Sequence, residues 1–257
     1  MSFTAKSTSE EVISAFTTQA KGKYVVVTGG NVGLGKETVT SLALAGAHVT
    51  IACRTELSGL EVIDNIKSKH TDVDVSVIPL DLSDFVSIKA FADKYITTGK
   101  PLHILINNAG IMGCPLAYTK QGYESQFGVN HLGHFLLTNL LLPLLKQSGT
   151  AESPARVINI SSLANLFFAP TEGIDFNNLK AEHSYNAWTK YGESKLSNIL
   201  FSNELNRIMK QENQHVISMS LHPGFITNTS LARNLHMFQA FKLAFWLIFL
   251  MPRKSYR

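Results

Sequence analysis

The stretch that decides the fold is Lys23-Tyr-Val-Val-Val-Thr-Gly-Gly-Asn-Val-Gly-Leu-Gly35. Residues 24–27 form a short apolar run of the length that makes one buried strand. Residues 36–46 follow the glycine turn, and their apolar spacing predicts a helix. A strand, a glycine-rich turn and a helix in this order are the setting in which a dinucleotide pyrophosphate binds, at the positive end of the helix dipole.

Three glycines in this turn have separate predicted tasks. Gly29 permits the tight turn, Gly33 lets backbone N–H groups approach a pyrophosphate, and Gly35 lets the helix pack closely on the strand. The spacing Gly-x-x-x-Gly-x-Gly differs from the commoner Gly-x-Gly-x-x-Gly. Taken alone, the loop is therefore also compatible with a purely structural turn.

Composition limits the classes of protein that this chain can belong to. Its 257 residues suit one α/β domain, and charged residues, at 16%, are fewer than usual, so much of the chain is core or interface. The net charge of +4 is modest, and no basic patch interleaves with aromatic residues, so we expect no nucleic-acid partner. A mild positive charge favours an anionic ligand. Cys53 and Cys114 have neither metal-ligand spacing nor a disulfide framework, which favours a reducing compartment.

The two ends of the chain bear on localisation. Residues 1–22 are expected to be a lead-in with one short helix over 9–19, capped by Ser9. They lack the basic region and apolar core of a signal peptide, which predicts a cytoplasmic protein. The apolar stretch 238–251 is too short to span a bilayer and contains Lys242, but it suits peripheral contact with a membrane surface.

Strand patterns alternate with helix patterns along the rest of the chain. The predicted strands are 24–27, 47–53, 73–80, 102–106, 156–160 and 215–221. The predicted helices are 36–46, 56–69, 84–95 (capped by Ser83 or Asp84), a long apolar helix within 122–147, and 188–211. This alternation predicts a Rossmann-type, doubly wound parallel sheet in a single α/β domain over residues 23–257.

Ligands bind such sheets beyond the carboxyl ends of the strands, so the residues there are candidates for a site. Those after strands two to six are Arg54, Asp81 with Leu82, Asn108-Ala109-Gly110, Ser161 with Ser162, and Pro223-Gly224. Arg54 stands where a carboxylate would bind the ribose of NAD, and a guanidinium suits the 2′-phosphate of NADP. NADP(H) is therefore favoured over NAD(H), with a solvated arginine as the alternative. Asp81 either binds the adenine amino group or caps the next helix.

Tyr191 and Lys195 are the strongest catalytic candidates. Their four-residue spacing places them on one face of a helix. A nearby ammonium favours the tyrosinate and is expected to lower the pKa of Tyr191, which suits proton exchange with a carbonyl or alcohol oxygen. Ser162 adds a hydroxyl to hold that oxygen, and Asn130 is placed to orient a relay water from within the long helix.

Together these motifs resemble the short-chain dehydrogenase/reductase family over about residues 23–233. The motifs that carry this resemblance are Thr28-Gly-Gly-Asn-Val-Gly-Leu-Gly35, Asn107-Asn-Ala-Gly110, Asn130, Ile160-Ser-Ser162, Tyr191-x-x-x-Lys195 and Pro223-Gly224. The finer resemblance is to the branch that holds retinol dehydrogenases and the oxidoreductase domain of the WW-domain-containing oxidoreductase. Its marks are Ala52-Cys-Arg54, Val129-Asn-His-Leu-Gly-His-Phe135, Tyr191-x-x-Ser-Lys-Leu-Ser-Asn198 and Leu221-His-Pro-Gly224; no WW domain is present.

The resemblance implies a catalytic tetrad and a nicotinamide cofactor. The tetrad would be Asn130, Ser162, Tyr191 and Lys195. The implied cofactor contacts are Thr28, Gly29, Asn31, Gly33, Leu34, Gly35, Arg54, Asp81, Leu82, Asn108, Ala109, Gly110, Tyr191, Lys195, Pro223, Gly224, Thr227 and Thr229. Hydride would pass between NADP(H) and a carbonyl or alcohol carbon while Tyr191 exchanges the proton.

Large apolar residues bear on the substrate. They lie between Ser162 and Tyr191 and again after residue 224, where the family places its substrate lobe, here 234–251. They favour a small lipophilic carbonyl or alcohol, such as a retinoid, a steroid or an aldehyde, with plain core packing as the alternative.

Two further expectations concern the whole chain. Relatives continue with a further strand and helix where this chain stops at Arg257, so we expect a sheet without its usual last strand and helix. That leaves a second hypothesis, a shortened cofactor- or partner-binding relative with little turnover. The apolar helices 133–145 and 188–209 suit a homodimer, although each could equally be buried within one subunit.

Overall fold

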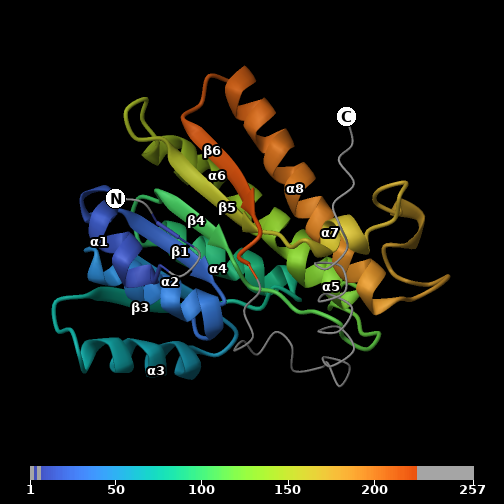
Figure 1. The fold of residues 1–257 in the computed structure, drawn as a ribbon, viewed down its shortest axis with the longest axis horizontal. Coiled ribbons are helices and arrows are strands. Elements are labelled where there is room, and N and C mark those ends of the chain that lie inside the picture. The colour runs from blue at the N-terminus through green and yellow to red at the C-terminus, as the bar shows by residue number, and fades with distance from the viewer. Residues whose placement is uncertain (1–2, 5–6, 225–257) are drawn as a thin grey trace.

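The computed structural model describes residues 3–4 and 7–224, and within them six parallel strands form one sheet in the order β3-β2-β1-β4-β5-β6 (Figure 1). The strands are β1 (Tyr24–Thr28), β2 (His48–Cys53), β3 (Asp74–Pro79), β4 (Ile104–Asn107), β5 (Ala155–Ile160) and β6 (Val216–Leu221). The α-helices are α1 (Ser9–Ala20), α2 (Gly33–Leu44), α3 (Glu56–Lys67), α4 (Phe85–Thr97), α5 (Ser125–Phe127), α6 (Gly133–Ser148), α7 (Ala164–Phe167) and α8 (Ala187–Gln211). Two further helical segments are the π-helix η1 (Gly128–Leu132) and the 3-10 helix η2 (Phe176–Asn178). The predicted Rossmann-type parallel sheet is confirmed.

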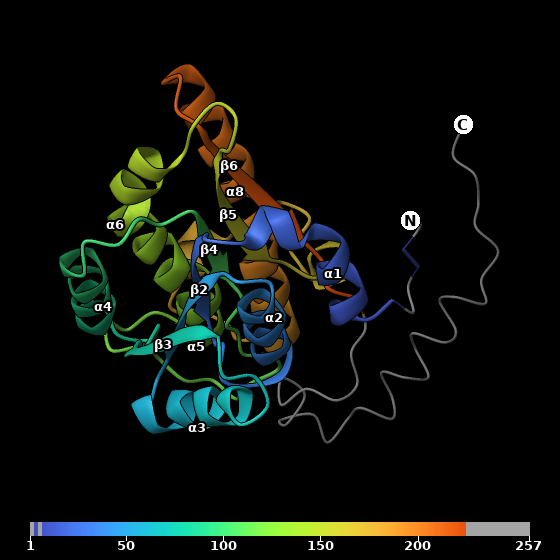
Figure 2. The ribbon, with the colours of Figure 1, turned by 90° about the vertical axis from the view of Figure 1, so that its left-hand side faces the viewer.

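A hydrophobic core lies on each face of the sheet. On one face, helices α4, α6 and α8 contribute buried residues such as Phe91, Leu141 and Met209. On the other face, α2 and α3 pack over β1, β2 and β3. Figure 2 shows α4 and α6 to one side of the sheet and α1 and α2 to the other. Strand β1 is buried almost throughout because it is covered on both faces, which explains its continuous apolar sequence.

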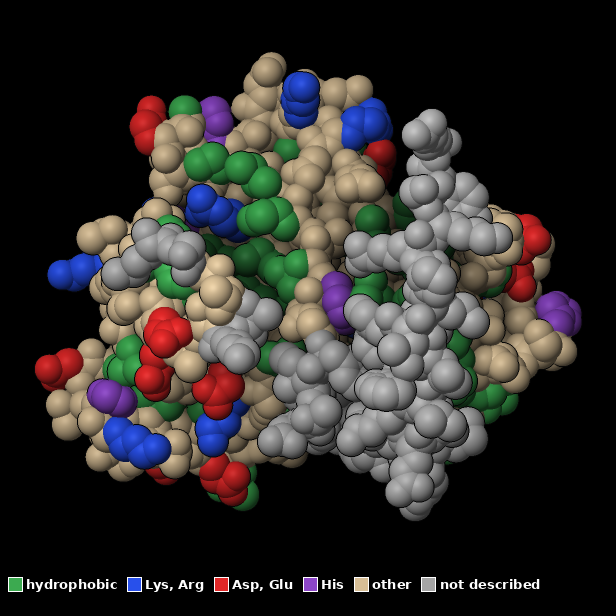
Figure 3. Space-filling model, viewed as in Figure 1, with side chains coloured by type: hydrophobic (Ala, Val, Ile, Leu, Met, Phe, Trp, Pro, Cys, Tyr) green, Lys and Arg blue, Asp and Glu red, His purple; other side chains and the backbone are tan. Residues whose placement is uncertain are grey.

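Strand β6 lies at the edge of the described sheet and differs from the central strands. Its Val216 and Ser218 are buried, whereas Ile217, Met219 and Leu221 remain about two-fifths exposed (41%, 39% and 41%). The alternation arises because α8 covers only one face of this strand. Figure 3 shows hydrophobic side chains gathered over this part of the sheet.

One helix cap and one helix start differ from the sequence predictions. Helix α1 is capped by Thr8 rather than Ser9, because Thr8 and Glu11 form a reciprocal capping box. Helix α2 begins at Gly33 rather than Lys36, so its first turn is part of the glycine motif itself. The backbone N–H groups of that motif are therefore the N-terminal groups of the helix.

Helix α4 begins at Phe85, and Asp84 rather than Ser83 is its cap. The carboxylate of Asp84 accepts a hydrogen bond of 2.9 Å from the N–H of Val86. Asn186 caps α8 in the same way, by accepting from the N–H groups of Trp188 and Thr189.

The long helix predicted within 122–147 is interrupted. It consists of the short α5, the π-helix η1 and then α6. Asn130 lies in the π-helix, where the backbone pairing is shifted by one residue from that of an α-helix. π-helical turns of this kind occur frequently at functional sites.

Some predictions lie outside the described residues. These are the substrate-lobe segment 234–251, the membrane-contact stretch 238–251, Thr227, Thr229 and the absence of a further strand and helix. Among the residues described, none of the helices has both the length and the apolar character to cross a membrane.

Candidate active site

The glycine motif connects β1 to α2 with close backbone packing. Gly29 has a φ of +65°, and an added Cβ there would lie 3.1 Å from the Cα of Ala109. A Cβ on Gly35 would overlap the carbonyl oxygen of Gly29, which shows the tight contact between helix and loop that the sequence predicts. Gly33, with a φ of +53°, begins the helix. Only glycine takes these left-handed conformations without strain.

The N-terminus of α2 suits an anion. Among the described residues, no side chain caps this helix at Val32, and its first turn holds no acidic residue. The first N–H groups of a helix have no partner within the helix, and they carry the positive end of its dipole. A pyrophosphate would therefore find hydrogen-bond donors and a favourable field at residues 33–35.

Thr28 joins the ends of β1 and β4. Its Oγ1 accepts hydrogen bonds from the backbone N–H groups of Asn108 (2.9 Å) and Ala109 (3.0 Å). In return, the side chain of Asn108 donates to the carbonyl of Thr28 at 2.9 Å. This pairing explains one of the two adjacent asparagines. Asn107 points instead into the core, where its Nδ2 donates to Thr138 and Asn159.

His134 connects Thr28 to the π-helix. Its Nδ1 lies 3.0 Å from the carbonyl oxygen of Asn130, and its Nε2 lies 2.8 Å from Oγ1 of Thr28. A carbonyl can only accept, so Nδ1 carries the proton and Nε2 accepts from the threonine hydroxyl. Burial lowers the pKa of His134 to about 3, so the ring is neutral at physiological pH. The sequence analysis assigned no role to this histidine and so missed it.

Asn130 holds neighbouring chain segments together. Its Oδ1 accepts from the N–H of Ile111, and its Nδ2 donates to the carbonyl of Ile111, both at 2.9 Å. The same Nδ2 donates to Oγ of Ser194 at 3.1 Å. Both hydrogens of the Asn130 side-chain amide are therefore used within the protein. The backbone carbonyl of Asn130 accepts a hydrogen bond from His134. The expected water relay could involve Asn130 only through acceptor atoms, and the residue lies in a π-helix rather than an α-helix.

Ser162, Tyr191 and Lys195 come together at the carboxyl end of β5. Tyr191 is buried, and an interaction with the side chain of Ser162 acts to lower the pKa of its phenol. Nζ of Lys195 lies 5.6 Å from the centre of the Tyr191 ring and donates to the carbonyl of Ile160 at 3.0 Å. Ser161 accompanies them, since its hydroxyl donates to the carbonyl of Lys195 at 2.8 Å.

The pKa of Tyr191 is shifted in the direction opposite to the sequence prediction. Burial raises it to about 12, and the interaction with Ser162 offsets only part of that increase. The charge of Lys195 doesn't outweigh the loss of solvation around the phenol. Burial also lowers the pKa of Lys195 itself, to about 8. At neutral pH the site therefore holds a protonated phenol beside a largely protonated amine.

Gly110 separates two of the candidate residues. A Cβ at this position would lie 3.3 Å from Oδ1 of Asn130 and 3.6 Å from Nζ of Lys195. Pro223 and Gly224 follow β6, and Gly224 has a φ of +85°. The candidate residues that follow β4, β5 and β6 thus all lie at the carboxyl ends of these parallel strands.

The candidates after β2 and β3 have different surroundings. Arg54 is exposed directly after β2, which pairs with β1. Asn31 donates from Nδ2 to Oγ of Ser58 at 3.2 Å, so the glycine loop contacts the start of α3. Leu34 is half-buried in the first turn of α2, whereas the side chain of Leu82 is buried in the core.

Asp81 does not cap α4, as one of the two sequence interpretations had it, but stabilises the turn before that helix. Its Oδ1 accepts from the backbone N–H (2.9 Å) and the hydroxyl (2.7 Å) of Ser83. This carboxylate therefore stabilises the turn that precedes α4, while Asp84 caps the helix. In the described parts of the chain, no three His, Cys, Asp or Glu side chains gather in a way that could hold a metal ion.

The family follows from comparison with known proteins. The model of the family described as short chain dehydrogenase matches residues 23–173. The chain belongs to the short-chain dehydrogenase family. Among its relatives, retinol dehydrogenase 11 of Homo sapiens is 49% identical over 210 residues, which are 82% of this chain and 63% of that protein. Retinol dehydrogenase 12 of Mus musculus is 46% identical over 219 residues, which are 85% of this chain and 66% of that protein.

Two solved structures are also similar to this chain in sequence and fold. A protein from Mycobacterium paratuberculosis is 39% identical with a TM-score of 0.68, over 83% of this chain and 72% of that one. A complex described as Pseudomonas aeruginosa RhlG/NADP active-site complex is 30% identical with a TM-score of 0.66, over 84% of this chain and 77% of that one. The retinol dehydrogenase-like character inferred from the motifs is confirmed. The chain spans just under two thirds of the length of the two retinol dehydrogenases above.

Proposed function

We propose that this short-chain dehydrogenase transfers a hydride between NADP(H) and a carbonyl or alcohol group of a lipophilic substrate, with Tyr191 as the general acid and base. One observation carries the proposal: the buried Tyr191 interacts with the side chain of Ser162, and its ring lies 5.6 Å from Nζ of Lys195. The bound cofactor supplies or accepts the hydride.

Each residue has a task in carbonyl reduction. Tyr191 donates its phenolic proton to the carbonyl oxygen as negative charge develops there. Ser162 donates a second hydrogen bond to the same oxygen and stabilises that charge. Lys195 stabilises the tyrosinate that remains, because its positive charge lies beside the ring. In alcohol oxidation the proton moves in the opposite direction.

The cofactor assignment draws on the glycine motif and Arg54. The uncapped first turn of α2 and the close packing of Gly29 with Gly35 suit a pyrophosphate. Arg54 and Asn31 would then hold the 2′-phosphate of NADP, since position 54 offers a cation where NAD would need a carboxylate. The RhlG complex, described with NADP, adds support from a relative that is 30% identical.

The substrate class draws on the segment between Ser162 and α8. Four of its large apolar side chains are exposed beside the site, namely Leu163 (37%), Leu166 (71%), Phe167 (54%) and Phe176 (74%). Large apolar side chains exposed in such number suit contact with an apolar partner. The similarity to retinol dehydrogenases makes retinoids the first class to test.

A membrane surface suits such a substrate. On the sequence alone, we place the reaction in the cytoplasm, with the apolar stretch 238–251 in contact with a membrane. A retinoid or steroid partitions into lipid, so an enzyme at the surface would meet a higher local concentration of it.

The decisive test is turnover by the purified chain. We would offer NADPH or NADH with all-trans-retinal, a steroid ketone or a medium-chain aldehyde, and compare Tyr191→Phe. We expect NADPH-dependent reduction that falls by about 10²- to 10⁴-fold in Tyr191→Phe, the usual contribution of a general acid. Arg54→Ala should raise the KM for NADPH while leaving that for NADH nearly unchanged. Binding of NADPH without turnover of any substrate would instead favour the cofactor-binding or partner-binding alternative.

A further inference from the structure

Helix α8 carries a buried ion pair as well as Tyr191 and Lys195. Nζ of Lys190 lies 2.8 Å from Oε2 of Glu193, and the two side chains are 4% and 0% exposed. Removing two charges from water costs several kcal/mol for each ion, so such a pair needs further hydrogen bonds to persist. Those bonds come from outside the helix.

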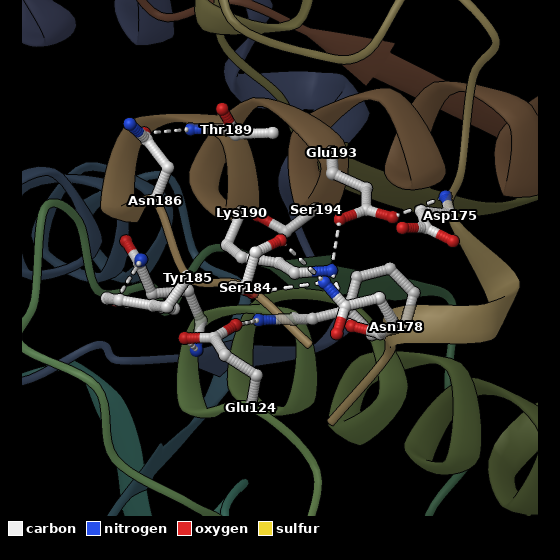
Figure 4. Close-up of polar contacts among 12 residues, drawn as sticks. Glu124, Asp175, Asn178, Ser184, Tyr185, Asn186, Thr189, Lys190, Glu193 and Ser194 are labelled. Carbon is white, nitrogen blue, oxygen red and sulfur yellow. Dashed lines mark hydrogen bonds and ion pairs between the residues drawn. The ribbon is translucent and has the colours of Figure 1, made fainter. Parts of the chain in front are cut away.

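Both charged groups bind the backbone of the segment that precedes α8. Nζ of Lys190 donates to the carbonyl of Asn178 at 2.7 Å. Oε1 of Glu193 accepts from the N–H of Asp175 at 2.7 Å. Figure 4 shows the two side chains directed from the helix toward this segment. The ion pair therefore attaches residues 175–178 to the helix that carries the candidate catalytic tyrosine.

This attached segment, residues 163–186, also lies against α8 beside Tyr191. A Cβ on Gly192 would lie 2.5 Å from the backbone N of Ala169 and 2.8 Å from the carbonyl oxygen of Ala164. Gly192 thus allows the 163–186 segment to approach the helix one residue from Tyr191. The segment begins at the residue after Ser162, so both of its ends adjoin the candidate site.

The middle of the segment contacts the ion pair and borders a cavity. A cavity of about 190 Å³ separates it from the helix, and residues of both line this cavity, including Asp175, Asn178, Lys190 and Glu193. The end of the segment has other anchors, since Nε2 of Gln126 donates to the hydroxyl of Tyr185 at 3.1 Å. Polar contacts with Lys190 and Glu193 therefore hold residues 175–178, and directly after them the carbonyl of Leu179 accepts from the N–H of Glu124 at 3.2 Å.

We propose that Lys190 and Glu193 are positioning residues that hold the 163–186 segment against α8, so that its apolar side chains form a fixed wall for a lipophilic substrate. The pair then sets the affinity for that substrate, while Tyr191 performs the proton transfer. This inference rests on the proposed hydride-transfer function and assigns the substrate-binding part of it to residues outside the tetrad.

Paired variants separate positioning from mere stability. Lys190→Met or Glu193→Leu alone leaves an unpaired charge in the interior and should destabilise the fold. The double variant Lys190→Met/Glu193→Leu leaves neither charge and keeps a similar volume, so it should regain most of the lost stability. Its side chains nevertheless cannot bind the backbone of Asn178 and Asp175, so residues 175–178 lose this attachment to the helix.

Three measurements on the double variant test the proposal. We expect hydrogen exchange of the Asp175 amide to accelerate, because that N–H loses its acceptor. We expect the KM for all-trans-retinal to rise about tenfold, with a change in kcat below about threefold, since the loss is in substrate binding. The Kd for NADPH should stay at the wild-type value.

Helix α8 also supplies a matched control. Glu204 and Arg207 form an ion pair of the same i, i+3 spacing, with both side chains exposed. The double variant Glu204→Leu/Arg207→Met should change neither the exchange at Asp175 nor the KM for all-trans-retinal.

Two results would overturn the proposal. One is a stable Lys190→Met/Glu193→Leu protein with wild-type exchange and wild-type KM. The other is a parallel loss of kcat, NADPH binding and stability, which a purely structural role predicts. If the wild-type chain reduces none of the test substrates, the proposed function has failed separately. Exchange of the Asp175 amide in the double variant then decides the positioning role, and an unchanged rate refutes it.

Discussion

At the residue scale, Lys195 is placed to govern proton transfer. Its Nζ donates to the carbonyl of Ile160 and lies beside the Tyr191 ring. Burial lowers its pKa to about 8, whereas burial raises the pKa of Tyr191 to about 12. Between these values the phenol stays protonated while the amine loses its charge.

This difference predicts the pH dependence of carbonyl reduction. As the pH rises through about 8, Lys195 becomes neutral and no longer stabilises the tyrosinate, so kcat/KM with NADPH should fall. In Lys195→Arg, the fall in kcat/KM with rising pH should begin at a higher pH, because a guanidinium stays protonated. Pre-steady-state or steady-state rates between pH 6 and 10 would show this. If kcat/KM of Lys195→Arg still falls near pH 8, the ionisation belongs to another group.

His134 and His131 make stability depend on pH. Burial lowers their pKa values to about 3 and about 4, so both are neutral in the folded protein. Below the unfolded-state pKa of about 6.5, the unfolded chain binds protons that the folded chain does not. The free energy of unfolding should therefore fall as the pH decreases, by about 2 kcal/mol for each histidine between pH 7 and pH 5.

Denaturant unfolding at pH 7, 6 and 5 would measure this change. His134→Gln should show a shallower dependence than the wild type, because one of the two groups is gone. His70 is exposed, and His70→Gln is the matched control that should leave the slope unchanged. Equal slopes in the wild type and His134→Gln would show that this ring isn't held neutral by the fold.

At the element scale, the contact between the glycine loop and α2 determines whether a pyrophosphate can bind. Gly35 lies so close to the carbonyl of Gly29 and to Nδ2 of Asn108 (2.6 Å from an added Cβ) that no side chain fits. The contact involves backbone atoms, so it cannot relax by rotating a side chain alone.

Gly35→Ala should therefore displace the loop. We expect a loss of stability of about 1–3 kcal/mol, the usual cost of overpacking, together with weaker NADPH binding. Glu37→Ala, at an exposed position of the same helix, is the control and should change neither. Thermal unfolding and fluorescence titration with NADPH would measure both effects. Normal NADPH binding by Gly35→Ala would show that the loop tolerates a side chain.

The same elements show what sequence reasoning could reach. The strand-end positions of Ser162, Arg54 and Asn108 follow from the alternation of strands and helices, because parallel strands end at one edge. The pKa of Tyr191 could not be predicted, since it depends on burial that only the folded chain defines. The contacts of Glu193 were missed because Asp175 is distant in sequence and offers only its backbone N–H.

At the scale of the whole molecule, α6 and α8 each expose a large apolar side chain. Phe135 and Leu200 are 45% and 46% exposed, and Phe135 packs against Phe201 with 5.2 Å between ring centres. The two helices lie side by side on one face of the sheet (Figure 1). We propose that this surface forms a two-fold homodimer, in which the same patch meets itself.

Charge placed on that patch should abolish the dimer. In Phe135→Asp/Leu200→Asp, we expect a monomer by sedimentation, because two pairs of carboxylates would be buried at the two-fold axis. Leu57→Asp, at a 68% exposed position on α3, should leave the mass in solution unchanged. A wild-type chain that sediments as a monomer would refute the dimer.

The buried pair of Lys190 and Glu193 also constrains how this family can diversify. Either substitution alone leaves a charge without its partner in the interior, at a cost of about 3–5 kcal/mol, which is a large share of the stability of a typical domain. Lineages that carry only one of the two changes would therefore be eliminated by selection. We expect positions 190 and 193 to vary together among relatives, and each joint change to be accompanied by a different sequence over residues 170–186.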